Sequence, residues 1–268
     1  MSDDAAPLPM WLRVVVPLAL GAVVLALWEA LVWWLAVPKF VLPAPSLIAR
    51  SLASDYPSLL VSLWMTLRIT LLAFGLALVC GVALAVLSAQ SRLVEISLFP
   101  YAVVLQVTPV VAIAPLILIW VGVENVDRAL LILATIVAFF PILSNTTLGL
   151  KSVDHNLRDL FQLYGATRWQ RLRHLQLPTS LPYLLGGMKI SGGLALIGAV
   201  VAEFVAGSGT GAGLAWRIVE SANRLNIPRM FAALIMLSAL GIAIFLLLAG
   251  LQTLLLRHWH ESAVRRER

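Results

Sequence analysis

Six long apolar segments constrain this chain more than any other feature of its sequence. They cover approximately residues 11–37, 62–87, 98–121, 129–150, 183–206 and 230–256. A run of about 20 apolar residues is long enough for a helix to cross the hydrocarbon core of a bilayer. Because lipid offers no hydrogen-bond partners to a peptide backbone, apolar segments of this length cross it as helices. We therefore expect an all-α membrane protein with six transmembrane helices.

The composition supports this fold class. Hydrophobic residues make up 61% of the 268 residues and charged residues only 12%, whereas a soluble domain is about half apolar and a quarter charged. A net charge of +6 would favour nucleic acid as the partner of a soluble protein. In a membrane protein it is typical of basic cytoplasmic loops. We therefore expect lipid, and no nucleic acid, around the chain.

The segments define one six-span transmembrane domain over residues 11–256, containing a polar loop at residues 151–182. Residues 1–10 form an N-terminal segment without a clear cleavage site, and residues 257–268 form a basic C-terminal tail. An even number of spans places both termini on one side. That side, which includes the 151–182 loop, is richer in Lys and Arg and is predicted to be cytoplasmic. The expected location is the inner (plasma) membrane of a bacterium, with several crossings.

The 151–182 loop is a charged, helix-forming segment between apolar spans. Asp154 is placed to cap a first helix. Leu157, Leu160, Phe161 and Tyr164 follow at the spacing of one helix face. The next residue, a glycine, is suited to ending that helix in the left-handed conformation.

A second short helix follows in the same loop. Thr167 is placed to cap it, Trp169 and Leu172 share a face, and Pro178 is expected to end it. The two helices would expose an apolar ridge with a basic rim made by Arg158, Arg168, Arg171 and Arg173. Such a ridge needs cover. It could pack on the chain's own spans, lie in the lipid interface or insert into a groove of another protein.

The loop resembles the signature E-A-A-x3-G-x9-I-x-L-P of binding-protein-dependent ABC transporter permeases. Gly165 takes the position of the glycine, Leu175 that of the isoleucine, and Leu177 and Pro178 close the motif. The stretches "FVLPAPSLI", "VTPVVAIAPLILIWVG" and "GAVVAEFVAGSGTGAGL" are similar to the branch that handles nitrate, sulfonates, taurine and thiamine or riboflavin precursors. The chain departs from the motif where Asp159, Leu160 and Phe161 stand in place of E-A-A.

This resemblance implies the type I ABC importer permease fold, with the 151–182 loop as a coupling helix. It implies a homodimer with two ATPase subunits and a periplasmic solute-binding protein. The solute would be a small organic anion of the sulfonate, taurine or nitrate kind, or a pyrimidine- or flavin-type heterocycle. The residues expected to contact the ATPase are Asp159, Leu160, Phe161, Tyr164, Gly165, Ala166, Thr167, Arg168, Trp169, Leu172 and Pro178.

No catalytic site or cofactor is expected in this chain. It lacks a Walker A motif, so ATP and Mg²⁺ would be bound by the partner ATPase. Four histidines, His155, His174, His258 and His260, show no metal-ligand spacing. Two other classes of function stay open, a stand-alone secondary transporter or channel and a membrane-embedded enzyme or scaffold.

Polar residues inside the apolar segments are candidates for the translocation pathway, because polar groups in lipid are costly. The candidates are Gln106, Thr108, Pro109, Asn145 and Glu203. Glu203 could act as a gate, or it could pair with an arginine at the headgroup level. The other polar groups could instead make hydrogen bonds between helices.

Two stripes of small residues predict close helix packing. One carries Ala77, Gly81 and Ala85, and the other includes Gly187 and Ser191 and continues through Ala195 and Ala199. Such stripes let helix backbones approach each other in lipid. For the first stripe we expect the partner helix to belong to the same chain. For the second stripe both a helix of the same chain and a helix of a second subunit stay open.

Overall fold

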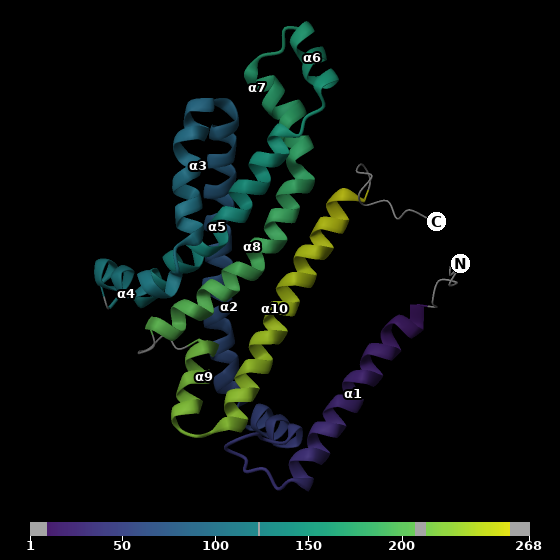
Figure 1. The fold of residues 1–268 in the computed structure, drawn as a ribbon, viewed down its shortest axis with the longest axis vertical. Helices are drawn as coiled ribbons and strands as arrows, with labels where there is room; N and C mark the ends of the chain where they lie inside the picture. The colour runs from purple at the N-terminus through teal and green to yellow at the C-terminus, as the bar shows by residue number, and fades with distance from the viewer. Residues whose placement is uncertain (1–9, 123, 207–212, 258–268) are drawn as a thin grey trace. The chain divides into compact units, whose positions relative to one another are not determined.

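The computed structural model describes residues 10–122, 124–206 and 213–257 (Figure 1). Every regular element in these ranges is a helix. In chain order the elements are α1 (Met10–Trp34), α2 (Pro45–Gln90), α3 (Arg92–Val107), α4 (Val110–Val121), α5 (Val126–Lys151), α6 (His155–Leu163), α7 (Arg168–Arg171), the π-helix η1 (Leu172–Gln176), α8 (Leu177–Ala206), α9 (Leu214–Asn223) and α10 (Ile227–Leu256).

The third expected span is broken. Within the described residues five helices are long and apolar enough to cross a membrane, and α3 and α4 make a sixth span only if they are counted together. These two helices meet at an angle of 102°. Pro109 explains the break, because the residue before a proline is driven out of the helical conformation. Thr108 accordingly has an extended backbone with φ −70° and ψ 123°.

The second expected span belongs to a longer helix than the sequence predicts. A span at residues 62–87 was expected, but α2 runs unbroken over 46 residues. Pro57 lies inside it and removes only one backbone donor. The Ser54 and Ser58 hydroxyls donate to the Ser51 and Asp55 carbonyls of the same helix at 3.2 and 2.9 Å, and the chain continues as a helix through the proline.

The described chain divides into two compact units, Met1–Leu59 with Arg217–Ile235 and Leu60–Trp216 with Met236–Arg268, as far as these residues are described. In the first unit Glu29 fastens α1 to the start of α2. Its carboxylate accepts hydrogen bonds from the Ser46 amide at 3.0 Å, the Ser46 hydroxyl at 2.8 Å and the Trp33 indole at 3.0 Å. Trp28 packs against Phe231 with ring centroids 6.0 Å apart.

The second unit is built around the pair α5 and α8, which lie side by side in Figure 1. Their backbones approach closely. A Cβ on Gly187 would lie 2.9 Å from the Pro141 carbonyl oxygen, and the Ser191 hydroxyl donates to the Ala138 carbonyl at 2.6 Å. Ala195 and Ala199 are fully buried on the same face of α8. The small residues of α8 therefore pack within this chain.

The small residues of α2 also pack on α5. A Cβ on Gly81 would lie 2.8 Å from the Ile142 side chain. Ala77 joins a buried cluster with Ala138 and Ile142. Small residues thus hold α2, α5 and α8 together. In lipid the hydrophobic effect does not drive helices together, so their association depends on close van der Waals contact.

Candidate functional site

The segment from α6 to α7 begins with a locally stabilised helix. The Asp154 carboxylate accepts from the backbone amides of Asn156 at 2.8 Å and Leu157 at 3.3 Å. At the other end of α6 Gly165 has φ +65°, the left-handed conformation that favours glycine. The Ala166 amide donates to the Phe161 carbonyl at 2.9 Å, which completes a Schellman-type end. The sequence predictions for Asp154 and Gly165 are confirmed.

The start of α7 is capped as the sequence predicts. The Thr167 hydroxyl accepts from the Gln170 amide at 3.2 Å, and the Gln170 side chain accepts from the Thr167 amide at 2.8 Å. The two bonds form a reciprocal capping box. The turn between α6 and α7 is therefore held by backbone and side-chain hydrogen bonds on both sides of Gly165.

The prediction that Pro178 ends this second helix is wrong. α7 passes through the π turn of η1 directly into α8, and one continuous helical segment covers Arg168–Val205. A proline ring clashes with the carbonyl four residues earlier in a regular helix. The wider π turn immediately before Pro178 can absorb that clash, so the chain stays helical. The loop is thereby joined rigidly to a membrane-spanning helix.

The apolar ridge is present, with one change in its membership. Tyr164 is 84% exposed and Trp169 is 64% exposed, and Leu157 and Leu160 are also exposed. Leu172 does not share the face of Trp169, because it is only 5% exposed and packs in a core cluster with Leu143 and other residues of the bundle. The π turn begins at Leu172 and changes the direction in which the following side chains point.

A groove lies between the two helices of this loop. It has a volume of about 490 Å³ and is lined by Leu160, Phe161, Tyr164, Ala166, Gln170 and His174. Phe161 is half-buried at its base. We call the exposed residues Leu157, Leu160, Tyr164 and Trp169, together with this groove, the loop surface.

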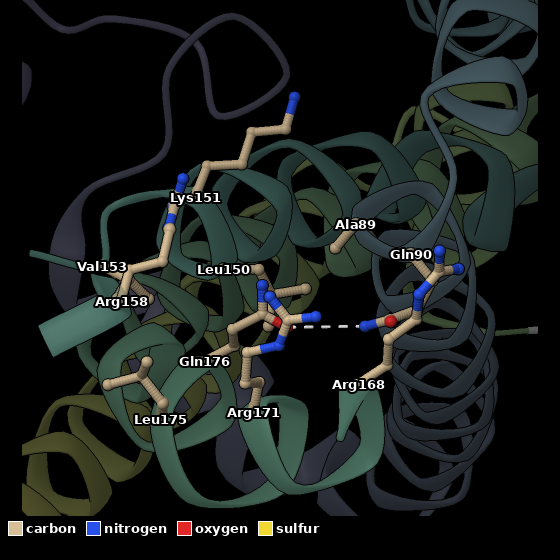
Figure 2. A pocket seen from close by; sticks show the side chains of 10 residues that line it. All are labelled: Ala89, Gln90, Leu150, Lys151, Val153, Arg158, Arg168, Arg171, Leu175 and Gln176. Atoms are coloured by element: carbon tan, nitrogen blue, oxygen red, sulfur yellow. Dashed lines mark hydrogen bonds between the residues drawn. The ribbon is translucent and has the colours of Figure 1, made fainter. Parts of the chain in front are cut away.

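Three of the four arginines expected on the rim of the ridge face elsewhere. Arg158, Arg168 and Arg171 line a separate pocket against the ends of α2 and α5 (Figure 2). Arg173 is exposed and does not line that pocket. Three of the four arginines therefore line one pocket and the fourth lies outside it. The sequence pattern did not predict this separation.

The pathway candidates fall in two different places. Gln106, Thr108 and Pro109 lie at the break between α3 and α4, where the side chain of Gln106 is exposed. The Thr108 hydroxyl donates to the Val104 carbonyl at 2.7 Å. Asn145 lies in α5, and its amide donates to the Pro141 carbonyl at 2.8 Å, where it faces Gly187. Thr108 and Asn145 thus satisfy carbonyls of their own helices.

Glu203 is buried at 4% exposure and is held by several donors. Its carboxylate accepts from the Thr66 hydroxyl of α2 at 2.8 Å and from the Ala215 amide at the start of α9 at 3.0 Å. The Leu214 amide donates to the Thr66 hydroxyl oxygen at 2.9 Å. We call Glu203, Thr66 and the amides of Leu214 and Ala215 the Glu203 cluster. The groups that donate hydrogen bonds to Glu203 come from α2 and α9. Among the described residues no arginine forms an ion pair with Glu203.

Thr66 and Gly213 belong to this site but were missed by the sequence analysis. A Cβ on Gly213 would overlap the Glu203 carboxylate, so any larger residue would displace that carboxylate from its donors. No sequence signal marks Thr66, because it lies 137 positions from Glu203 and resembles any other small polar residue in an apolar helix. Within the described residues no group of three His, Cys, Asp or Glu side chains could hold a metal ion.

The described residues thus form an all-α membrane bundle with a capped helical loop between α5 and α8. The chain belongs to the family of binding-protein-dependent transport system inner membrane components, whose model matches residues 77–261. It is therefore the permease component of an ABC importer, a multi-pass protein of the inner membrane. As such a component it is not itself an enzyme and binds no cofactor.

Individual relatives support this assignment. The riboflavin transport system permease protein RibX of Chloroflexus aurantiacus is 36% identical over 242 residues, which are 89% of this chain and 87% of the relative. The formylaminopyrimidine transport permease protein ThiX of Halalkalibacterium halodurans is 31% identical over 233 residues, 87% of this chain and 91% of the relative. The fold also matches a crystal structure of an amino acid ABC transporter with histidines, with a TM-score of 0.62 and 20% identity over 77% of this chain and 96% of the other.

Proposed function

We propose that this permease carries a flavin- or pyrimidine-type heterocycle, delivered by a periplasmic binding protein, through a homodimer driven by two ATPase subunits. The similarity to a riboflavin permease and to a formylaminopyrimidine permease supports this class of solute. The binding-protein-dependent family supports the ATPase and binding-protein partners. The observation that carries the coupling mechanism is the exposed apolar loop surface on a rigidly capped turn.

The loop surface is our candidate contact with the ATPase. Tyr164 and Trp169 expose most of their side chains on a polar end of the molecule, and exposed aromatic groups beside a groove are typical of helix docking sites. Ala166 and Thr167 lie on the same capped turn as Gly165, and Asp159 lies in the helix α6 that leads into it. A partner that closes on this turn would move it as one body.

Movement of the loop would reach the transmembrane helices through buried side chains. Leu172 and Leu175 are buried at 5% and 7% exposure, and α7 continues through η1 and Pro178 into α8. Packed helix interfaces move between discrete arrangements rather than deforming continuously. We infer that the loop transmits ATP-site closure to α8, with Leu172 anchoring it to the bundle.

For the pathway, we assign the solute-lining role to Gln106, Thr108 and Pro109 at the break between α3 and α4. Broken helices expose polar backbone and side-chain groups inside a membrane only where they line a cavity or are covered by protein. Asn145 and Glu203 are proposed to position the pathway helices, because their polar atoms are engaged with α5, α2 and α9.

Uptake in reconstituted vesicles tests the solute. The permease, its copurified ATPase and the cognate binding protein are placed in liposomes with internal ATP, and uptake of riboflavin, formylaminopyrimidine, taurine and nitrate is compared. We expect ATP-dependent uptake of a heterocycle. Uptake of taurine or nitrate alone would contradict the proposed solute, and uptake without ATPase would favour a stand-alone carrier.

Copurification tests the docking surface. We expect Tyr164→Asp and Trp169→Asp to remove the copurifying ATPase, because each places a charge in an apolar contact. Gln162→Asp is the matched control, since Gln162 is exposed on α6 but does not line the groove. Retention of the ATPase by both aromatic variants would contradict the proposed contact.

The proposed orientation places both termini and the loop surface in the cytoplasm. The bias of Lys and Arg toward that side supports it. Single cysteines at Gln162 and at Lys39, in a Cys80→Ser background, are to be labelled from outside with a membrane-impermeant maleimide. We expect labelling at position 39 and none at position 162. The reverse pattern would contradict the orientation.

A further inference from the structure

The pocket in Figure 2 is lined by positively charged side chains and by no acidic side chain of the described residues. It has a volume of about 280 Å³ and is lined by Ala89, Gln90, Leu150, Lys151, Val153, Arg158, Arg168, Arg171, Leu175 and Gln176. These residues come from α2, α5, the α5–α6 connection, α6, α7 and η1. The lining includes three arginines and one lysine, and no carboxylate among the described residues.

No carboxylate among the described residues forms an ion pair with the three arginines of this pocket. Lys151 forms an ion pair with Glu95, so its charge is already matched. Arg158, Arg168 and Arg171 form no ion pair in the described part of the chain. These three guanidinium groups therefore give the wall of one small cavity a net positive charge, which favours the binding of an anion.

The pocket also offers neutral donors. The Gln90 amide donates to the Gln176 side-chain oxygen at 3.4 Å, and both glutamines line the cavity. In Figure 2 the side chains of Arg168 and Arg171 rise from α7 toward this pair. Guanidinium and amide N–H groups are the donors that recognise phosphate, with the guanidinium able to bind two oxygens at once.

The backbone around the pocket is also unusual. η1 is a π-helix, and it supplies Leu175 and Gln176 to the wall. Single π turns inside α-helices are frequent at functional sites. The π turn holds Leu175 buried behind the cavity while Gln176 stays half-buried at its edge. The pocket is thus a feature of the same turn that joins the loop to α8.

We propose that this pocket is a binding site for a phosphate group, which would bridge the loop to the ends of α2 and α5. Its volume lies below the roughly 300–1,000 Å³ of pockets for drug-sized ligands, which suits a small oxyanion or a headgroup. Basic pockets between transmembrane helices bind anionic lipid headgroups. The phosphate can come from such a headgroup or from a free anion in solution, and the chemistry of recognition is shared.

A phosphate group bound in this pocket would stabilise one position of the 151–182 loop. Arg158 lies on α6 and Arg171 on α7, so one bound phosphate would tie both loop helices to Gln90 on α2. This role is independent of the transported solute. The pocket and the groove of the loop surface share no lining residue, and of the residues expected to contact the ATPase only Arg168 lines the pocket.

Binding is measured on the full chain purified without its ATPase, so failure of the coupling proposal does not affect the result. Inorganic phosphate is titrated in phosphate-free buffer by calorimetry. Arg158→Gln and Arg171→Gln are each expected to weaken binding roughly tenfold or more, as loss of one charge-assisted hydrogen bond predicts. Arg173→Gln, the matched control, removes the same charge outside the pocket and should change the affinity by less than about twofold.

The second arm distinguishes the source of the phosphate. Native mass spectrometry follows phosphatidylglycerol and phosphatidylcholine carried by the chain from mixed vesicles. Retention of phosphatidylglycerol that is lost in Arg158→Gln and Arg171→Gln but kept in Arg173→Gln assigns a lipid headgroup. Arginine-dependent binding of inorganic phosphate without lipid retention assigns a free anion.

Three results would overturn the proposal: binding of neither probe, binding unchanged in both pocket variants, or binding reduced equally by Arg173→Gln. Size-exclusion profiles and thermal midpoints confirm that each variant is folded. If Arg171→Gln does not fold, Arg158→Gln on the separate helix α6 decides the question.

Discussion

The loop surface and the Glu203 cluster lie toward opposite ends of α8 and are built in opposite ways. The loop is held by partners within five positions along the chain and leaves its aromatic groups exposed. In the Glu203 cluster, Thr66 bonds to Glu203, 137 positions away, and to Leu214, 148 positions away. All three residues are buried from solvent. A segment stabilised by its own caps can keep an apolar surface free for a partner. A buried carboxylate instead has to find all its donors inside the fold.

The strongest test of this comparison is the removal of the buried carboxylate. We expect Glu203→Ala to lower the free energy of unfolding by about 3 kcal/mol, because an unsatisfied buried polar group costs about 1–3 kcal/mol and Glu203→Ala leaves more than one donor without its acceptor. The unfolding of the purified chain in detergent measures this. Glu203→Gln keeps one acceptor and should lose less. Equal stability of Glu203→Ala and the parent chain would show that the cluster does not hold α9.

A smaller effect is expected at the glycine of the loop. Gly165→Val places a β-branched residue at φ +65°, which costs roughly 1–2 kcal/mol and distorts the turn. We expect the spans to stay folded while ATP hydrolysis no longer drives uptake in vesicles. Gly165→Asn is the control, since asparagine tolerates this conformation. Normal coupled uptake by Gly165→Val would remove the loop from the coupling mechanism.

The smallest effect is expected at the surface of α9, whose start is held by Glu203. The Arg217 side chain hydrogen-bonds to Glu220 at 2.8 Å and keeps the pKa of that carboxyl below its usual range, with help from Arg224 at 3.0 Å. A lowered pKa stabilises the fold at pH values above the usual carboxyl range, and this stabilisation is lost as the pH falls through the lowered pKa.

Because an ion pair at the protein surface contributes only about 0–1 kcal/mol, Glu220→Gln should lower the thermal midpoint slightly at pH 7. The difference from the parent chain should vanish in acid. A difference that is constant with pH would mean that the side chain acts by packing and not by charge.

The two regions also differ in how well the sequence predicted them. Asp154, Gly165 and Thr167 were identified as capping residues because each acts on backbone groups within five positions. Glu203 was recognised as unusual, but its partners were not, because Thr66 is reached only through the packing of α2 on α8. Thr108 and Pro109 were identified as candidates inside an apolar segment, but the 102° bend between the two helices beside them was not predicted.

The sequence by itself determined the class of this protein, the membrane-spanning helices and the ends of the loop helices. Apolar length and local capping decide these, and both are properties of short stretches of chain. Only the tertiary structure decided which way each helix faces. Leu172 packs into the bundle while Arg158, Arg168 and Arg171 line one pocket, because the rotation of a helix about its axis is set by the neighbours it packs against.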